Sequence, residues 1–455
     1  MDSAVVAALI AGGFAVVTLA GTVFAQLRGF RRTREELDRT LAQQRDRTLN
    51  ERFATAADRL GNDKPPAVRL AGAYAMAGLA DDWPENRQTC VDVLCAYLRL
   101  PYDPDPGDGA EPADRAAYRA NREVRHTIIR VIGAHLHPDM DPRKSWQGLN
   151  LDFTEVVFDG GDFAGARFSG IVRFDRASFS GGVVDVGGAE FSAREVRFRG
   201  AKFSGATADF SGAEFSGGKV RFGGAEFSPG TVNFHSAVFS GATVDFGAEF
   251  SPIGKVRFGG VKFSGARADF SHAEFSGGTV SFEHAEFSRG WVDFSFAKFS
   301  GATARFRSAE FCATVDFTRA EFSGSIINFR GAKFSGGTVS FRDAEFSKGI
   351  VHFGGGAKFS ATVHFSGAKF SGSIINFRSA RFTDGIVDFP RATFSGSPID
   401  FGYAGFDGGT VDFRNPFVWA KPPMFDRYDT PPAGLMLPPA SADATPADSP
   451  GPGDG

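Results

Sequence analysis

The 455-residue chain is poor in the residues that usually build reactive sites. Its three cysteines are too few and too unevenly spaced for a disulfide framework or a zinc site, which favours a reducing compartment. Cys90 and Cys95 lie five positions apart on a predicted helix and share no face, so both are interpreted as buried small hydrophobic residues. Neither a GxxxxGK[ST] loop nor a GxGxxG turn after a strand is present, because GGGAKF (354–359) belongs to a repeat.

The eight histidines are scattered along the sequence. His135 and His137 fall on opposite sides of a predicted helix end, as surface residues do. His352 and His364 occupy the same repeat position, but a metal site would need a third ligand in register with them. Serines recur after a phenylalanine in nearly every repeat, which is typical of turn hydroxyls rather than nucleophiles. We therefore expect no catalytic residue, no cofactor, no metal site and no enzyme activity.

Phenylalanine, by contrast, is abundant and regularly spaced. Of the 51 phenylalanines, 45 lie between residues 149 and 413, and among these only Phe296 is off the repeat pattern. The repeating unit is A-x-F-S-x-x-x-V-x-F-x-x-A-x-F. One stretch (273–299) shows spacings of seven and five, with phenylalanine at Phe275, Phe282, Phe287, Phe294 and Phe299. Such self-similarity is the signature of a repeat architecture.

Neither spacing keeps phenylalanine on one stripe of an α-helix, and glycines interrupt nearly every unit. A simple two-stranded alternation also fails, because a Gly- or Ser-bearing corner follows each apolar pair. Short straight segments joined by regular corners predict a mainly β fold, a solenoid with Phe, Val and Ala pointing inward.

The start of the repeats, LNLDFTEVVFDGGDFAGARF, resembles the pentapeptide-repeat family. It has Phe153, Phe158, Phe163 and Phe168 five apart, with a small or aliphatic residue two positions before three of them. The resemblance covers residues 149–413 and implies a right-handed, four-sided parallel β-helix. These four phenylalanines and the five of the 273–299 stretch are therefore the expected structural core.

Spacings of five and seven alternate from about Phe174 onward, which predicts a coil of about 24 residues. A 12-residue coil would leave no room for two phenyl rings at close packing. However, a 24-residue coil stacks like charges, because Arg173, Asp185, Arg197 and Asp209 alternate in sign every twelve residues. Exposed charge pairs are worth only ~0–1 kcal/mol, so core packing should prevail. Eleven coils at ~4.8 Å would form a rod about 50 Å long.

Irregular spacings predict local bulges. They occur at Val186, 246–250, 306–317 and 353–365.

Residues 1–28 are expected to form a transmembrane helix. The stretch 3–27 carries no charge and would span ~36 Å as a helix, against a hydrocarbon core of ~30 Å. A cleaved signal peptide is the alternative, since Val23 and Ala25 have the spacing of a cleavage site. The arginines that follow, from Arg28 to Arg34, place the rest of the chain in the cytoplasm by the positive-inside rule. We expect a single-pass protein of the cell membrane.

Between this segment and the repeats the sequence predicts helices. Residues 29–61 form an amphipathic juxtamembrane helix that either pairs with a second copy or makes a solvated stalk. Residues 62–148 form a small α-helical domain with helices at 68–80, 86–100 and 122–136. This region looks like the helical segment that precedes the β-helix in membrane-anchored bacterial proteins of the same family.

Both ends of the solenoid need a cover, because terminal repeats expose apolar surface. Trp146 is expected to cover the first coil. Residues 414–429 are expected to cap the last, through Phe417, Trp419 and Phe425. Residues 430–455 are rich in proline and poor in apolar residues, which predicts a disordered tail.

The function that follows is a non-catalytic, membrane-anchored scaffold that displays a rigid rod to unknown protein partners, with homo-oligomers also compatible. Some soluble members of the family mimic DNA towards a topoisomerase, and this is the alternative function. That mimicry needs a strongly acidic rod, whereas residues 149–413 hold 28 acidic and 27 basic side chains. No basic stripe suggests direct nucleic-acid binding.

Overall fold

The computed structural model describes residues 34, 36–61, 63–102, 105–227, 229–250, 255–426 and 430–439. The predicted transmembrane segment, residues 3–27, lies outside them. Within these ranges, no helix is both long enough and apolar enough to cross a bilayer. The chain divides into two compact units, Met1–Cys90 and Val91–Gly455. This division crosses the predicted helical domain, 62–148, instead of following its bounds.

The described part of the first unit is helical. It contains a helix over residues 36–60, α2 (Pro66–Asp82), the 3-10 turn η1 (Pro84–Asn86) and the start of α3 (Arg87–Leu98). A proline stands in the first turn of α2, where its missing N–H costs nothing. Gly72 permits a close helix crossing, since a Cβ there would lie 2.9 Å from the backbone nitrogen of Leu60. In the helix 36–60, Leu49 and Leu60 are buried but Leu37 is 56% exposed, so only its C-terminal half packs inward.

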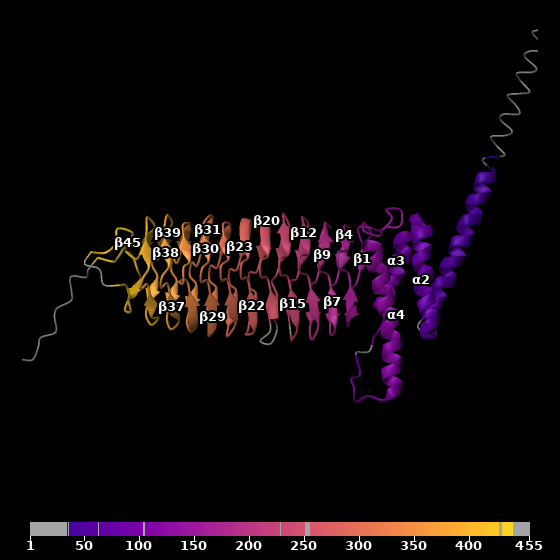
Figure 1. The fold of residues 1–455 in the computed structure, drawn as a ribbon, viewed down its shortest axis with the longest axis horizontal. Coiled ribbons are helices and arrows are strands. Elements are labelled where there is room, and N and C mark those ends of the chain that lie inside the picture. The colour runs from indigo at the N-terminus through magenta and orange to yellow at the C-terminus, as the bar shows by residue number, and fades with distance from the viewer. Residues whose placement is uncertain are drawn as a thin grey trace, which may run out of the picture. The chain divides into compact units, whose positions relative to one another are not determined.

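The second unit begins with the end of α3 and with α4 (Pro112–Leu136), which packs on the first coil of a β-solenoid (Figure 1). The predicted helix at 122–136 is real but starts ten residues earlier, at Pro112, which occupies the first turn. Its predicted apolar face, which includes Ile128 and Ile132, is buried. Gly133 brings the helix against the coil, because a Cβ there would lie 2.6 Å from the carbonyl oxygen of Asp162.

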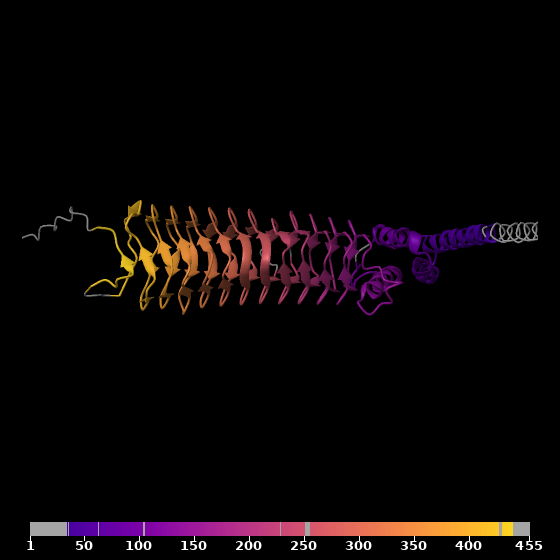
Figure 2. The same ribbon diagram turned by 90° about the horizontal axis from the view of Figure 1, so that it is seen from above.

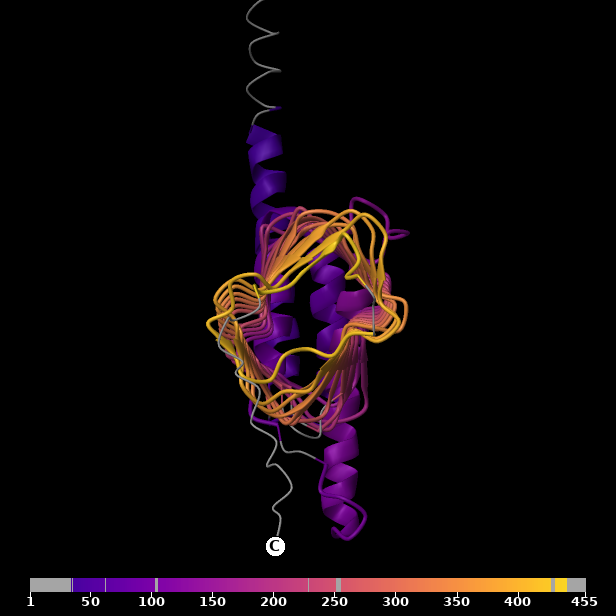
Figure 3. The same cartoon turned by 90° about the vertical axis from the view of Figure 1, so that its left-hand side faces the viewer.

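Each turn of the solenoid has four faces, I to IV in chain order. The turns superimpose when viewed along the stack (Figure 3) and follow one another along one axis (Figure 2). All strand pairs are parallel, and Phe203 lies beside Phe227, 24 residues further on. The predicted 24-residue coil is therefore confirmed. Faces I and IV join in a 22-stranded sheet, face II is a 12-stranded sheet and face III an 11-stranded sheet.

The strands of faces I and II follow the chain in order. Face I consists of β1 (Leu151–Asp152), β5 (Val172–Arg173), β9 (Glu195–Arg197), β13 (Lys219–Arg221), β17 (Thr243–Asp245), β27 (Thr314–Asp316), β31 (Thr338–Ser340), β35 (Thr362–His364), β39 (Ile386–Asp388), β43 (Thr410–Asp412) and β45 (Leu435–Met436). Face II consists of β2 (Val157–Phe158), β6 (Ser178–Phe179), β10 (Lys202–Phe203), β14 (Glu226–Phe227), β18 (Glu249–Phe250), β21 (Glu274–Phe275), β24 (Lys298–Ser300), β28 (Glu321–Ser323), β32 (Glu345–Phe346), β36 (Lys369–Phe370), β40 (Thr393–Phe394) and β44 (Val418–Trp419).

The other two faces lie opposite these. Face III consists of β3 (Gly161–Asp162), β7 (Val183–Asp185), β11 (Thr207–Asp209), β15 (Thr231–Asn233), β19 (Lys255–Arg257), β22 (Thr279–Ser281), β25 (Thr303–Arg305), β29 (Ser325–Asn328), β33 (Gly349–His352), β37 (Ile374–Asn376) and β41 (Ile399–Asp400). Face IV consists of β4 (Arg167–Phe168), β8 (Glu190–Phe191), β12 (Glu214–Ser216), β16 (Val238–Ser240), β20 (Lys262–Asp269), β23 (Glu286–Asp293), β26 (Glu310–Phe311), β30 (Lys333–Phe334), β34 (Lys358–Phe359), β38 (Arg381–Phe382) and β42 (Gly405–Phe406). β20 and β23 continue across the corner into face I.

Phenyl rings stacked in register fill the interior. The rings of Phe282 and Phe306, for example, have centroids 4.9 Å apart and planes 1° from parallel. Nearly every phenylalanine of the repeats is buried, and the exceptions are Phe296 and the half-buried Phe406. Phe296 is 40% exposed at a corner, where it stacks on His272. Phe296 therefore lies outside the phenyl core in the structure, as it lies outside the repeat pattern in the sequence.

Outside the core, like charges do stack as a 24-residue coil requires. Arg173, Arg197 and Arg221 form one column on face I, and Asp185 lies beside Asp209 on face III. Their mutual repulsion is weaker than the packing of the phenyl core.

The irregular spacings do not produce the predicted bulges. Phe227 lies beside Phe250 and Phe334 beside Phe359, so the strands stay in register while the corners take up one residue fewer or more. The register shift that does occur lies between β20 and β23.

The solenoid also extends beyond its predicted end at 413. β44 and β45 continue faces II and I, which brings the stack to about twelve turns instead of eleven. The predicted disordered tail, 430–455, is wrong for its first part, because Leu435 is 7% exposed and its strand pairs with β43. Its apolar triplet LML supplies the strand. Residues 440–455 lie outside the described residues.

Candidate functional site

Most residues considered from the sequence have structural positions. The nine phenylalanines named as core all line the interior, each no more than 2% exposed (Phe153, Phe158, Phe163, Phe168, Phe275, Phe282, Phe287, Phe294 and Phe299). His352 lies on face III and His364 on face I, so the coil separates them. His364 instead contacts Asp388, with its Nδ1 2.8 Å from the carboxylate. The described part of the chain contains no group of three or more residues suited to hold a metal.

The cysteines of the helices are also structural. Cys90 and Cys95 are fully buried, and burial raises the pKa of Cys90 to about 11 and that of Cys95 to about 12. The thiolate is the reactive form of cysteine, so these thiols are poor nucleophiles at neutral pH. Cys312 is exposed on the solenoid, with its Sγ 3.1 Å from the hydroxyl of Ser335.

One polar cluster fastens the first coil to the residues that cover it. The carboxylate of Asp159, 11% exposed, accepts hydrogen bonds from the hydroxyls of Tyr102 and Tyr118, each at 2.7 Å. Arg122 donates to the same carboxylate at 3.1 Å and to the Asp159 carbonyl oxygen, and His126 Nε2 lies 2.8 Å from the carboxylate. We call these five residues the Asp159 cluster.

The Asp159 cluster has unusual protonation behaviour. Burial alone would raise the pKa of Asp159, but hydrogen bonds from His126 and the two tyrosines outweigh it and hold the pKa well below its usual range. Burial and the nearby carboxylate raise the pKa of both Tyr102 and Tyr118. Every member is engaged with another, so the cluster serves to fix α4 and its preceding loop on the coil.

Trp146 was expected to cover the first coil. It is fully buried and its ring stacks on His135 at 4.0 Å. The cover itself is mainly α4, which sequence analysis identified as a helix but did not place there.

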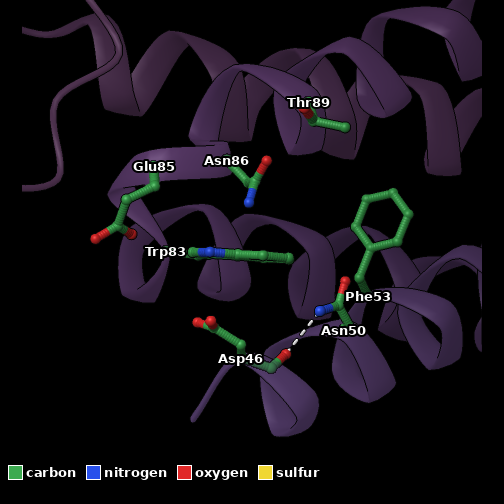
Figure 4. A pocket seen from close by; sticks show the side chains of 7 residues that line it. All are labelled: Asp46, Asn50, Phe53, Trp83, Glu85, Asn86 and Thr89. Atoms are coloured by element: carbon green, nitrogen blue, oxygen red, sulfur yellow. Dashed lines mark hydrogen bonds between the residues drawn. The ribbon is translucent and has the colours of Figure 1, made fainter. Parts of the chain in front are cut away.

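The first unit contains a cleft of about 540 Å³ (Figure 4). The helix 36–60 contributes Asp46, Asn50 and Phe53, and the segment from the end of α2 into α3 contributes the rest, Trp83, Glu85, Asn86 and Thr89. The amide of Asn50 donates to the Asp46 carbonyl oxygen at 2.7 Å, and Glu85 lies 3.8 Å from Arg45. Trp83 is only 9% exposed, so it packs the two segments together.

The lining of this cleft is chemically one-sided. Carboxylates, amides, one hydroxyl and two aromatic rings suit a cation or a hydrogen-bond donor. Among the described residues, neither Asp46 nor Glu85 hydrogen-bonds to a serine, cysteine or histidine, which a nucleophile and its base would require.

Ion pairs between neighbouring turns recur on the surface of the solenoid. Lys202 lies 3.6 Å from Glu226 on face II, and Lys262 lies 3.6 Å from Glu286 on face IV. About half of each side chain is exposed, so each pair contributes only ~0–1 kcal/mol. Such pairs make these faces polar and hydrated.

Face III is different, because it carries a column of isoleucines on its outside. Ile326, Ile350 and Ile374 stand beside one another on β29, β33 and β37. Ile326 is 46% exposed and Ile374 49% exposed. We call these three residues the isoleucine column. Sequence analysis missed it, although its signal is an isoleucine recurring every 24 residues directly before an inward-pointing Ile or Val.

Comparison with known families gives one match. Residues 355–405 match a family model described as pentapeptide repeats (9 copies). No curated protein and no solved structure matches the chain. The family match and the parallel β-solenoid together support a pentapeptide-repeat protein.

Proposed function

We propose that this pentapeptide-repeat β-solenoid is a non-catalytic scaffold that binds a protein partner on face III. The isoleucine column carries the proposal. Nearly half of Ile326 and of Ile374 is exposed in a regular row on a parallel sheet. Aligned apolar side chains of this kind are typical of protein-binding surfaces, whereas isolated ones are common everywhere.

The stiffness of the solenoid supports the same function. The phenyl stack fills the interior, so a partner can meet only the outer surface. Successive strands present side chains at a spacing of ~4.8 Å, and this surface needs little reordering on binding. Asn328, His352 and Asn376 form a polar column beside the isoleucines, which would supply the hydrogen-bonding rim of an interface.

The proposal includes an anchor. The uncharged stretch 3–27 and the arginines after it favour a single pass through a bacterial cell membrane, with the solenoid on the cytoplasmic side. Fractionation of cells expressing the full chain tests this part. We expect the protein to stay in washed membranes at high salt and at alkaline pH and to leave them only with detergent. Recovery in the soluble fraction would refute the anchor and leave the scaffold untouched.

Crosslinking in intact cells tests the scaffold. The full chain with a C-terminal tag should retain one or more proteins that are lost from the variant Ile326→Asp/Ile374→Asp. We expect the yield to fall at least about tenfold, because central apolar anchors of an interface each contribute about 2 kcal/mol or more. Both side chains are about half exposed, so the variant should still fold, although aspartate in a strand lowers the melting temperature by roughly a few degrees.

The chain offers a matched control on the opposite side of the coil. Ile386 on face I is 47% exposed, almost the same as Ile374. The variant Ile386→Asp should retain the partners. Equal losses from both variants would refute binding at face III. Recovery of the chain alone, crosslinked to itself through face III, would show that the column joins two copies.

A further inference from the structure

Face III also contains a hollow of about 450 Å³, in the turns before the isoleucine column. Its middle strand is β22, flanked by β19 and β25, and Figure 1 labels β22 on the solenoid. The strands contribute Lys255, Arg257, Thr279, Ser281 and Arg305. Histidines at a neighbouring corner, His235 and His284, also line it, together with Gly259, Glu283 and the buried Val256.

The register of the strands explains why the surface is hollowed here. Arg257 lies beside Ser281, and Ser281 lies beside Arg305. Two long side chains thus stand on either side of a short one, and their Cα atoms are two strand spacings apart, ~10 Å. Ser281 is half-buried between the two exposed arginines. Hydroxyls therefore form the floor, and guanidinium groups the walls.

Among the described residues, the cations of the hollow lack the carboxylate partners that several lysines have elsewhere on the solenoid. Lys262, Lys298 and Lys369 each face a glutamate on a neighbouring turn. Within the described residues, no such ion pair involves Lys255, Arg257 or Arg305, and Arg257 has the amide-bearing Asn233 on its other side. Glu283 is the single carboxylate of the lining, against three permanent cations.

The corner next to the hollow contains glycine, which leaves room for an imidazole. A Cβ on Gly259 would lie 3.0 Å from His235 Nδ1, so the imidazole lies over the glycine. His284 stands on the next turn, in the left-handed conformation with φ of 59°. Both imidazoles thus adjoin the arginine walls and add hydrogen-bonding nitrogens to the rim.

We propose that this hollow is a binding site for the phosphate group of a small soluble phosphomonoester. Two arginines facing each other across hydroxyl groups match the oxygens of a phosphate, which arginine recognises through paired N–H donors. The excess of cations draws a dianion, and the volume lies within the range of small-molecule sites. This proposal is independent of a partner on the isoleucine column.

Isothermal titration of the full chain in detergent tests the proposal, with inorganic phosphate and O-phosphoserine as separate probes at constant ionic strength. Both should bind saturably, with one site per chain. The variant Arg257→Gln/Arg305→Gln should weaken binding about tenfold or more, because both walls lose their charge. Arg342→Gln, at an exposed corner outside the hollow, removes one charge of the same kind and should change affinity less than twofold.

Ser281→Gln separates a shaped site from a general attraction to positive charge. It fills the floor without altering the charge, and it should abolish binding while the circular dichroism spectrum stays unchanged. Retained binding in Ser281→Gln, or equal weakening by Arg342→Gln, would overturn the proposal. So would the absence of saturation with both probes. Binding of a single-stranded oligonucleotide that neither probe displaces would assign the basic side chains to nucleic acid and would also overturn it.

Discussion

The two ends of the solenoid are closed in different ways. At the first coil, α4 lies across the turn, and the Asp159 cluster fixes it with directional hydrogen bonds of 2.7–3.1 Å. At the far end, aromatic contacts cover the core, such as the edge of Trp419 on Phe394 at 5.0 Å and Phe425 stacked on Phe401 at 5.2 Å. The side-chain hydrogen bonds there join exposed residues, as where Asp426 accepts from the Tyr403 N–H at 2.7 Å. Phe406 there is only half-buried. The first coil is therefore held by the hydrogen bonds of the Asp159 cluster, whereas the last coil has a looser apolar cover.

The largest effect is expected from removing the shared acceptor of the Asp159 cluster. Asp159→Ala leaves Tyr102, Tyr118 and Arg122 without their shared acceptor, and loss of a buried charged partner costs about 3–5 kcal/mol. Hydrogen exchange should show lost protection in α4 and the first coil, with unchanged protection near Phe401. Asp162→Ala is the control, because within the described residues that exposed carboxylate accepts only from the Ala164 N–H at 3.0 Å. Equal loss of protection at both ends of the solenoid would contradict a local effect of the Asp159 cluster.

Acid and alkali should open the same end, with a smaller effect than the substitution. The folded-state pKa of Asp159 is lowered, so its contribution is present above the unfolded value of ~3.9 and is lost as pH falls below it. The pKa values of Tyr102 and Tyr118 are raised, so their contribution is present below ~10 and is lost as pH rises above it.

Asp412 at the far end also has a lowered pKa, caused by its hydrogen bonds with Arg414. Arg414 is 57% exposed, however, so this pair is screened by solvent and contributes less. Hydrogen exchange followed from pH 3 to 11 should therefore show the first coil losing protection at both limits. Alkaline opening that begins at the last coil would contradict the tyrosine assignment.

Removing the apolar cover should have a smaller effect. Trp419 is half-buried, and Trp419→Ala uncovers the rings of Phe394 and Phe413, at about 1–3 kcal/mol. Exchange should increase over β40 to β45 only. Trp419→Phe keeps a ring over the last coil and should restore most of the protection. A loss that spreads to α4 would show that the solenoid unfolds as one unit.

The smallest effect is expected at Phe406. Phe406→Tyr adds one hydroxyl to a half-buried ring that already reaches solvent, so stability should change by less than about 0.5 kcal/mol. The equivalent change at Phe382, one turn earlier and fully buried, would leave a hydroxyl without a partner and should cost about 1–3 kcal/mol. Thermal unfolding of the two variants compares them directly. Similar losses would mean that the last coil is as tightly covered as the interior.

The sequence predicts the solenoid well because the repeat acts through one strong constraint. Each 12-residue unit contains two phenylalanines, and their rings can pack inside only if one coil contains two units and therefore four corners. The pairing of Phe203 with Phe227, 24 residues apart, confirms this. The apolar periodicity of the sequence likewise predicts the helices of the first unit and the apolar face of α4. The end of the solenoid was placed too early, because β45 contains no phenylalanine for the repeat pattern to detect.

The surfaces were harder to predict, because they depend on which residues the coil brings side by side. The Asp159 cluster joins residues 102–126 to a carboxylate 33 to 57 positions away, and the local sequence carries no sign of it. The hollow requires Arg257, Ser281 and Arg305 to be neighbours, which follows only once the 24-residue register is known. With that register, the isoleucine column could also have been found from the sequence.

One coil of 24 residues contains two 12-residue sequence units. The number of units that a duplication adds therefore determines the face on which all later residues lie. One added unit is half a turn, so every later residue would move to the opposite face. The isoleucine column would then leave the side that holds Arg257 and Arg305, whereas two added units would lengthen the solenoid and keep both on one side. Single-residue changes behave differently, since the corners at Phe250 and Phe359 absorb them without any rotation. Lengthening in pairs of units is thus the only step that preserves the pattern of the outer surface.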